Sequence, residues 1–573
     1  MQHFFHKTIA SKFWWLVLII LLAVLNFLAS AYHSRIDLTN EKRYTLSAAT
    51  KNLLNNLDDE IQITVFLKGD FPAGFKKLAI AVEEFLQECQ EQGRGKIIVQ
   101  FTDPLKNLTD TAASHFLDSM NYFYQLPAYT LQAPGKVGDE QTQKLVLPGA
   151  VISYKDTSIA VNLLKGNKSY GTDKEQLAEL YNDVEATLEY RFASAIQKIT
   201  SNKKPLVGYA MGHGEGWGYN IDDAVRTLMK DYRFDTLNIK QEPFIPADFE
   251  VLIFLKPTIP FTDADKLKID QYVMRGGKLF WMIDNMYAEF DSLYQSGGFI
   301  AFDRALNLED LFFNYGVRIN QNLLQDMQND KLPQLSDNEN VQQRRLVDWP
   351  FFPILNGTNH PISKNLDGVR SMFPNTLDTV KAVGIKKTFL LKSSANARIL
   401  EAPAKVDFEF LQIAPDIKQF TIKDTAVAVL LEGKFKSLFA NRISKNDQDA
   451  LAYYQVPFKT VADTDNKIIV VADGDIATNQ YSQMDGPLPM GMNIFTRYTF
   501  SNKEFFTNAL EYLVNPSGIL ETRAKDFTLR LLDPKKVKEE KTFWQLINIA
   551  LPVLLVILIG SIYQQFRKRK YAG

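Results

Sequence analysis

Two long apolar runs, one near each end of the chain, dominate the hydrophobic pattern. Residues 13–32 contain no charged side chain and are long enough to cross a bilayer, and residues 543–563 form a second run with aromatic side chains at both edges. We expect both runs to be transmembrane helices. A cleaved signal peptide is the alternative for the first run, because Ala-Ser-Ala at residues 29–31 resembles a small-residue cleavage site.

Basic residues beside the two runs predict their orientation. Lys7 and Lys12 precede the first run without an acidic neighbour, and the sequence RKRK, residues 567–570, follows the second. Positively charged flanks tend to stay in the cytoplasm. We therefore expect residues 1–12 and 564–573 to be cytoplasmic and the bulk of the chain to be periplasmic, with the protein in the inner membrane of a bacterium.

The segment after the first run, residues 33–203, has the pattern of an α/β domain. An alternating strand at 61–67, a helix at 73–92 and a strand at 96–104 form a βαβ unit, which implies a parallel pair. The shape suggests a thioredoxin-like fold, although no C-x-x-C motif is present. The same domain is expected to contain a helix capped by Ser47, a hairpin over 147–166 with Lys155 and Asp156 at its tip, and a long helix over 173–200.

Residues 204–540 are expected to form a second, larger α/β domain. Short links join alternating strands and helices, which predicts a doubly wound sheet. Residues 285–465 are less regular, and we expect them to be an insertion within this domain. Strands are expected at 205–211, 234–239, 249–255, 278–284 and within 466–479. Helices are expected at 221–232, at 262–277 with Thr262 as the N-cap, and at 502–515.

A glycine-rich segment, GHGEGWGYN at residues 212–220, follows the first strand of this second domain. Ligands of doubly wound sheets bind beyond the carboxyl ends of the strands. One interpretation is that His213 and Glu215 form an acid/base pair, or that backbone N–H groups form an anion pocket. The other is a turn in which the glycines adopt positive φ and Glu215 complements the positive end of the following helix. The turn is favoured, since no nucleophile lies nearby. The candidate binding residues are Gly212, His213, Gly214, Glu215, Trp217 and, at the end of a later strand, Asp284.

Composition and missing motifs exclude several kinds of chemistry. Lys+Arg 65 against Asp+Glu 66 gives no basic stripe for nucleic acid. The sequence has no phosphate loop, no complete dinucleotide fingerprint and no nucleophile elbow, and its six histidines lack metal spacing. Asp473 and Asp475 could hold a cation, but an Asp-Gly turn is the favoured interpretation. The only cysteine, Cys89, is expected to be a buried bystander. We expect no cofactor, no metal and no catalytic residue.

Two resemblances refine this picture. GHGE at 212–215 followed by residues 267–284 resembles the class I glutamine amidotransferase-like fold, but no cysteine follows Cys89 to act as nucleophile. Segments 35–54, 190–215 and 348–369 resemble GldG, the gliding-motility-associated ABC transporter auxiliary component. That resemblance implies a separate permease and a separate ATPase in Bacteroidetes-type bacteria.

We therefore expect a non-catalytic auxiliary subunit of an ABC-type transporter, linked to gliding motility or cell-envelope processes. Its periplasmic part would bind a substrate or partner. The expected partners are an ABC permease subunit, a cytoplasmic ATPase subunit, the lipid bilayer and envelope components. Two alternatives are a membrane-tethered periplasmic hydrolase that uses His213 and Glu215, and a module that binds envelope glycan or peptide near residues 212–218.

Overall fold

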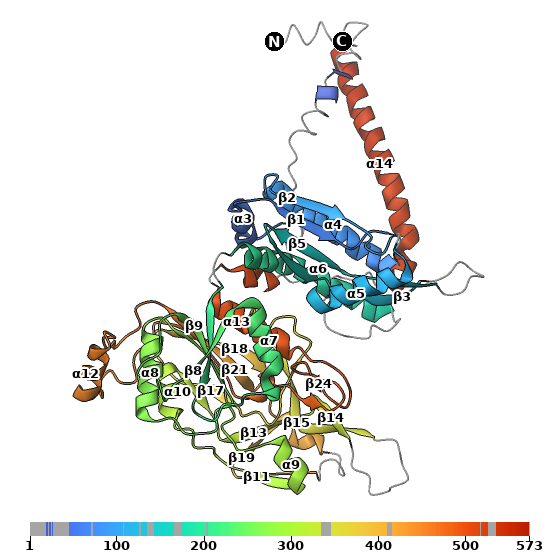
Figure 1. The fold of residues 1–573 in the computed structure, drawn as a ribbon. Coiled ribbons are helices and arrows are strands. Elements are labelled where there is room, and N and C mark those ends of the chain that lie inside the picture. Colours follow the sequence, from blue (N-terminus) through green and yellow to red (C-terminus); the bar gives the residue numbers. More distant parts are fainter. Residues whose placement is uncertain are drawn as a thin grey trace. The chain divides into compact units, whose positions relative to one another are not determined.

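The computed structural model forms two compact units, residues 1–526 and residues 527–573. Both belong to a mixed α/β chain with several sheets and one apolar C-terminal helix (Figure 1). The residues described are 19–20, 22–24, 26, 45–69, 71, 73–106, 108–124, 126, 128–133, 142–164, 174–201, 204–333, 345–408, 415–515, 517–524 and 534–571.

The N-terminal region contains a four-stranded mixed sheet. Strands β1 (Ile61–Val65) and β2 (Ile97–Phe101) run parallel and are joined by α4 (Ala73–Gln92), so the predicted βαβ unit is present. Strands β5 (Gly149–Tyr154) and β6 (Thr157–Asn162) form the predicted hairpin, which gives the strand order β2-β1-β5-β6.

Helices cover this sheet and share its apolar core. Ser47 caps α3 (Ala48–Asn55) as predicted, because its hydroxyl accepts the Thr50 N–H at 3.1 Å. Phe85 of α4 packs on Phe192 of α6 (Lys174–Thr200) with ring centroids 5.6 Å apart. The remaining elements of the region are α5 (Asp110–Tyr124) and the antiparallel pair β3 (Tyr129–Ala133) and β4 (Thr142–Val146).

A ten-stranded sheet organises the larger part of the chain, and its first half is parallel. The apolar runs of the sequence form β7 (Leu206–Met211), β9 (Phe249–Leu255), β10 (Lys278–Met282) and β22 (Asn466–Val471), with β8 (Arg233–Asn238) at the edge. Their order in the sheet is β8-β7-β9-β10-β22. The carboxyl ends of all five strands therefore lie at one edge.

The second half of the sheet is antiparallel, so the sheet is mixed, whereas the sequence predicted a doubly wound one. Four further strands follow β22 in the order β21-β18-β15-β14, and each runs antiparallel to its neighbour. Antiparallel neighbours need no crossover helix, which explains the irregular pattern of residues 285–465. These strands are β14 (Asn329–Pro333), β15 (Leu346–Gly357), β18 (Ile385–Lys392) and β21 (Ala426–Gly433), and β16 (Val369–Arg370) pairs with β15.

Helices cover both faces of the parallel strands. Successive residues of β10 point to opposite faces: Phe280 stacks on Phe506 of α13 (Asn502–Val514), and Trp281 meets Phe312 of α10 (Glu309–Tyr315) edge-on. Burial on both faces is why these strands are almost entirely apolar in sequence. Thr262 caps α8 (Asp263–Met274) as predicted, and α7 (Asp222–Asp231) follows the glycine-rich loop.

Short elements complete the region. Four two-stranded pairs are β11 (Gly298–Ala301) with β20 (Ala404–Asp407), β12 (Val317–Ile319) with β17 (Leu377–Thr379), β13 (Asn322–Asp326) with β19 (Ala397–Glu401), and β23 (Tyr481–Ser482) with β24 (Gly486–Pro487). The short helices are η1 (Tyr219–Ile221), α9 (Phe290–Ser296), η2 (Ile417–Gln419), α12 (Lys445–Tyr453), η3 (Asp475–Ala477) and η4 (Ile519–Ala524).

The described residues of the C-terminal unit form one long helix, α14 (Pro534–Tyr571). Residues Glu540–Arg569 have a mean hydropathy of 2.5 in their most apolar window, and none of that window is buried. Among the described residues this is the one helix with the length and composition to cross a membrane, and it contains the predicted run 543–563. Most of the predicted run 13–32 lies outside the described residues, of which 19–20, 22–24 and 26 are helical.

Candidate ligand-binding cleft

A cleft of about 570 Å³ opens at the carboxyl ends of the parallel strands. Its walls come from the loop after β7, the residues after β9, β10 and β22, and the segment near residue 495. In an α/β sheet this edge is where ligands usually bind, because neighbouring loops diverge there. The structure therefore brings the predicted 212–218 loop next to a cleft at the expected edge.

The glycines of this loop adopt backbone conformations that side chains disfavour. Gly212, Gly214 and Gly218 have φ values of 115°, 80° and 120°. A Cβ on Gly214 would lie 2.0 Å from Oγ1 of Thr258, which is closer than two non-bonded atoms can approach. Gly214 and Gly216 present their backbone to the cleft. Glycine is thus required at 214 for both conformation and space.

His213 is fully buried beneath the loop. Its ring stacks on Phe261 with centroids 3.7 Å apart, and its Nε2 lies 3.2 Å from Oδ2 of Asp265. Asp265 also belongs to the capping box of α8. Burial lowers the pKa of His213, although Asp265 opposes the shift, so the ring is neutral at pH 7 and its Nε2–H donates to the carboxylate. His213 ties the loop to the start of α8.

Glu215 is buried beside His213 and closes the turn. Its Oε2 accepts the backbone N–H of His213 at 2.7 Å. Burial raises the pKa of Glu215, and the hydrogen bonds from backbone N–H groups oppose that shift. The Oε1 atom faces Nδ1 of His213 at 3.9 Å, beyond hydrogen-bonding distance. Neither side chain lines the cleft, so the arrangement holds the loop and offers no acid or base to a ligand.

Trp217 lies on the surface outside the cleft lining. The residue is 57% exposed, and its ring packs against those of Tyr209 and Phe234, with centroids 5.8 and 6.5 Å away. Among the six predicted site residues, Gly214 lines the cleft directly, and Asp284 contributes through a charged network at its floor. The structure therefore brings together only part of the predicted set.

A lysine whose side chain is largely, but not fully, buried is the centre of that charged network. Lys256 follows β9 directly, and its Nζ lies 2.7 Å from Asp475, 2.9 Å from Glu289 and 3.1 Å from Asp284. Burial alone would lower the pKa of Lys256, but the three carboxylates together raise it well above its usual value. The lysine is therefore charged at every pH at which the fold is relevant.

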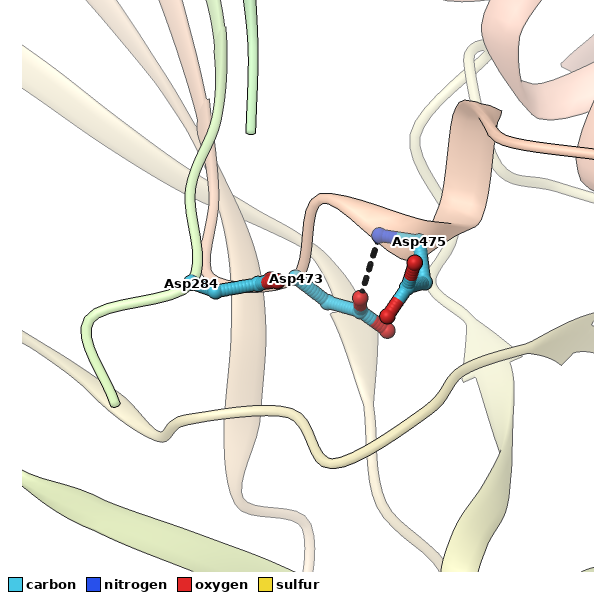
Figure 2. A group of neighbouring side chains, drawn as sticks. All are labelled: Asp284, Asp473 and Asp475. Carbon is cyan, nitrogen blue, oxygen red and sulfur yellow. Dashed lines mark hydrogen bonds between the residues drawn. The ribbon is translucent and has the colours of Figure 1, made fainter. Parts of the chain in front are cut away.

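Asp284, Asp473 and Asp475 gather next to this lysine. Figure 2 shows the three side chains, with the N–H of Asp475 bonded to Asp473 at 2.7 Å. One carboxylate oxygen from each lies within 4.8 Å of the others, a spacing that could suit a metal ion. Here the ammonium of Lys256 supplies the positive charge to Asp284 and Asp475.

The two aspartates after β22 play different parts. Asp473 is fully buried and accepts hydrogen bonds from the Ser371 hydroxyl and the Met372 N–H. It also accepts the N–H of Asp475 and so fixes the turn after β22, which agrees with the interpretation of this segment as an Asp-Gly turn. Burial and the charges of Asp475 and Asp284 raise its pKa well above the usual value. The pKa of Asp475 is raised to about 6 by burial and by Asp284 and Glu289, against the opposing charge of Lys256.

Sequence reasoning missed several residues of the cleft. Lys256, Glu289 and the aromatic residues Phe290, Tyr481 and Phe495 line it, yet none belongs to a motif. A weak signal was present for Lys256, because a charged residue directly after an apolar strand lies at the ligand-binding edge. The others depend on how residues 285–495 fold back toward β9, which the sequence pattern does not specify.

Two protein-family models match most of the chain between residues 40 and 509. A family model described as an ABC-type uncharacterized transport system matches residues 204–509, more than half of the chain, and one described as a domain of unknown function matches residues 40–153. An uncharacterized protein from Borreliella burgdorferi is 20% identical over 429 residues, which are 72% of this chain and 76% of the relative. The solved N-terminal domain of mmIFT52 is 13% identical, covers 54% of this chain and 97% of its own, and has a TM-score of 0.30, too low to support a conclusion.

Proposed function

Because the chain belongs to the family described as ABC-type uncharacterized transport system, we propose that it is a non-catalytic, membrane-anchored auxiliary subunit of an ABC-type transporter. The match over residues 204–509 is the observation that carries this proposal. The apolar helix α14 is consistent with a membrane location. Since the sequence contains no phosphate loop, the energy for transport would come from a separate cytoplasmic ATPase, with a separate permease forming the path.

The proposed topology places both chain ends in the cytoplasm. Residues 13–32 and the 543–563 part of α14 would cross the inner membrane, with the basic residues 567–570 on the cytoplasmic side. The periplasmic bulk would then consist of a first domain, residues 33–203, and a second, residues 204–540, with the insertion at about 285–465. We propose an amidotransferase-like scaffold for the second domain, supported by its five parallel strands.

The proposed role of the periplasmic part is to bind a substrate or an envelope partner in the cleft. Support comes from the position of the cleft at the carboxyl edge of the parallel strands and from its aromatic lining. The burial of His213 and Glu215 away from the cleft weighs against a hydrolase that uses this pair. By the resemblance of segments 35–54, 190–215 and 348–369, we extend the proposal to the gliding-motility-associated auxiliary components.

Affinity purification of the full-length chain from native membranes in a mild detergent tests this function. We expect a permease and an ATPase in near-stoichiometric amounts, and the complex should hydrolyse ATP while the chain alone does not. A control chain that ends before residue 534, and so lacks α14, should lose the permease. A homogeneous product that contains neither partner would refute the proposal.

A further inference from the structure

The walls of the cleft carry more negative than positive charge. Glu289, Asp291 and Asp475 line it, while Lys256 is the one cationic side chain among its described lining residues. Lys256 already forms ion pairs with Asp475, Glu289 and, behind the lining, Asp284. Three carboxylates therefore surround one ammonium, and a fourth acid, Asp291, lines the same cleft.

One further cation reaches this group from outside the cleft. Arg304 pairs with Glu289, and its side chain is almost completely buried. Two cations thus oppose Asp284, Glu289, Asp291 and Asp475, which gives a formal charge of −2 without the fully buried Asp473, whose pKa is raised well above its usual value. The raised pKa of Asp475 is consistent with this excess, because repulsion from Asp284 and Glu289 contributes to it.

The cleft lining includes an exposed acid with no ion-pair partner among the described residues. Asp291 is exposed in the first turn of α9, and it makes no ion pair or side-chain hydrogen bond with another described residue. The side chain of Asn220 and the hydroxyl of Tyr481 also line the cleft without a hydrogen bond within the described part of the chain. These groups are available to a ligand without breaking an internal contact.

The same cleft is also lined by aromatic rings. Phe290, Tyr481 and Phe495 line it; Tyr481 is 48% exposed and rests against Tyr219 with ring centroids 5.3 Å apart. Aromatic faces attract cations through the negative charge of their π systems and also pack against apolar stems. Acids and aromatic rings in one cleft favour the same type of ligand.

We propose that this cleft binds an organic cation, a protonated amine or guanidinium joined to an apolar stem, as in a lysine or arginine side chain of an extended polypeptide. The inference rests on the proposed function only in treating the cleft as a recognition site. Asp291 and the unpaired part of the negative charge attract the cation, and the aromatic rings hold the stem. An anionic ligand is disfavoured, because the ammonium of Lys256 is engaged with three carboxylates.

Titration calorimetry on the full-length chain in a non-ionic detergent tests the inference. The probes are capped pentapeptides, acetyl-Ala-Ala-X-Ala-Ala-amide, with lysine, arginine, norleucine or glutamate at X. Butylamine represents the lysine side chain alone, and chitotriose represents a neutral glycan. Norleucine keeps the apolar stem and removes the charge, so the comparison isolates the cation.

We expect the lysine and arginine peptides to bind at least about tenfold more tightly than the norleucine and glutamate peptides. Butylamine binding would identify a small amine as a sufficient ligand, and binding of the peptides alone would identify a polypeptide source. Asp291→Asn should weaken the lysine peptide by roughly fivefold. Asp449→Asn is the matched control, because Asp449 is an exposed helical aspartate outside the cleft lining, and it should change nothing.

Three results would overturn the inference. The norleucine and lysine peptides could bind equally, chitotriose could bind in place of the cations, or none of these probes could bind at millimolar concentration. An unchanged affinity in Asp291→Asn would also contradict the assigned site. Each of these results is separable from the subunit proposal, because the affinity purification does not depend on what occupies the cleft.

Discussion

Replacing Lys256 with methionine tests the charged floor of the cleft. Methionine keeps most of the apolar stem and removes the ammonium, so packing changes little while Asp284, Glu289 and Asp475 lose their shared cation. The lysine side chain is only 16% exposed, and its three ion pairs measure 2.7, 2.9 and 3.1 Å. The perturbation is therefore mainly electrostatic.

The expected cost follows from removing one partner of a buried charge network. Breaking a buried ion pair from one side typically destabilises a protein by about 3–5 kcal/mol, because the remaining charge stays buried without compensation. The matched control is Lys386→Met, whose side chain is 74% exposed and lies 3.5 Å from Glu432. An exposed pair of this kind contributes about 0–1 kcal/mol.

Urea unfolding followed by tryptophan fluorescence measures both free energies, because Trp281 and Trp349 are fully buried in this region. The loss should also depend on pH. Lys256 is the charge that holds down the pKa of Asp475, so without it that pKa rises further above its unfolded value near 4, and the folded variant binds a proton that the unfolded chain does not. The loss of stability relative to the wild type should therefore shrink as the pH falls from 7.5 toward 5.

Two results would refute this reasoning. One is a loss below about 1 kcal/mol at pH 7.5, comparable to that of the exposed control. The other is a loss that does not change between pH 7.5 and 5, which would mean that the carboxylates are not coupled to Lys256. Strong stabilisation of Lys256→Met by Ca²⁺ or Mg²⁺ would instead show that the three aspartates can hold a metal ion once the lysine is absent.

Two further predictions concern the glycine-rich loop and His360, a histidine outside the cleft. Gly214→Ala should destabilise the fold by roughly 1–3 kcal/mol in the same urea assay, through positive φ and the Thr258 clash, whereas Gly216→Ala, which has open space around it, should be close to neutral. Burial lowers the pKa of His360 to about 4, and its Nδ1 accepts the Ile362 N–H. Between pH 4 and 6.5 the folded chain therefore binds fewer protons at this residue than the unfolded chain does. Stability should fall as the pH falls through this window, and His360→Asn, which keeps an acceptor but does not titrate, should flatten that slope; an equal slope in both proteins would contradict it.

Local signals in the sequence predicted individual elements well. The caps at Ser47 and Thr262 and the hairpin with Lys155 at its turn all form as predicted, because each depends on residues a few positions apart. The continuous apolar runs of β9 and β10 likewise indicated strands buried on both faces. Such features are encoded within one short window.

Pairings between distant segments were less predictable. The antiparallel half of the large sheet joins β21 to β22, and no residue in either strand specifies whether its neighbour runs parallel. The role of His213 was also hidden, since its contact with Asp265 spans 52 positions and turns an apparent acid/base candidate into a buried support. Long-range contacts of this kind depend on packing, which the one-dimensional pattern does not contain.

Site-specific photo-crosslinking along α14 in living cells most directly tests the account of a permease-docked auxiliary subunit. A photoreactive residue would be placed at each position from 543 to 563 in turn, within the apolar part of the helix. The account predicts adducts with one polytopic permease at positions that repeat every three to four residues, as one helix face docks on a partner. Adducts with lipid alone at every position would contradict it.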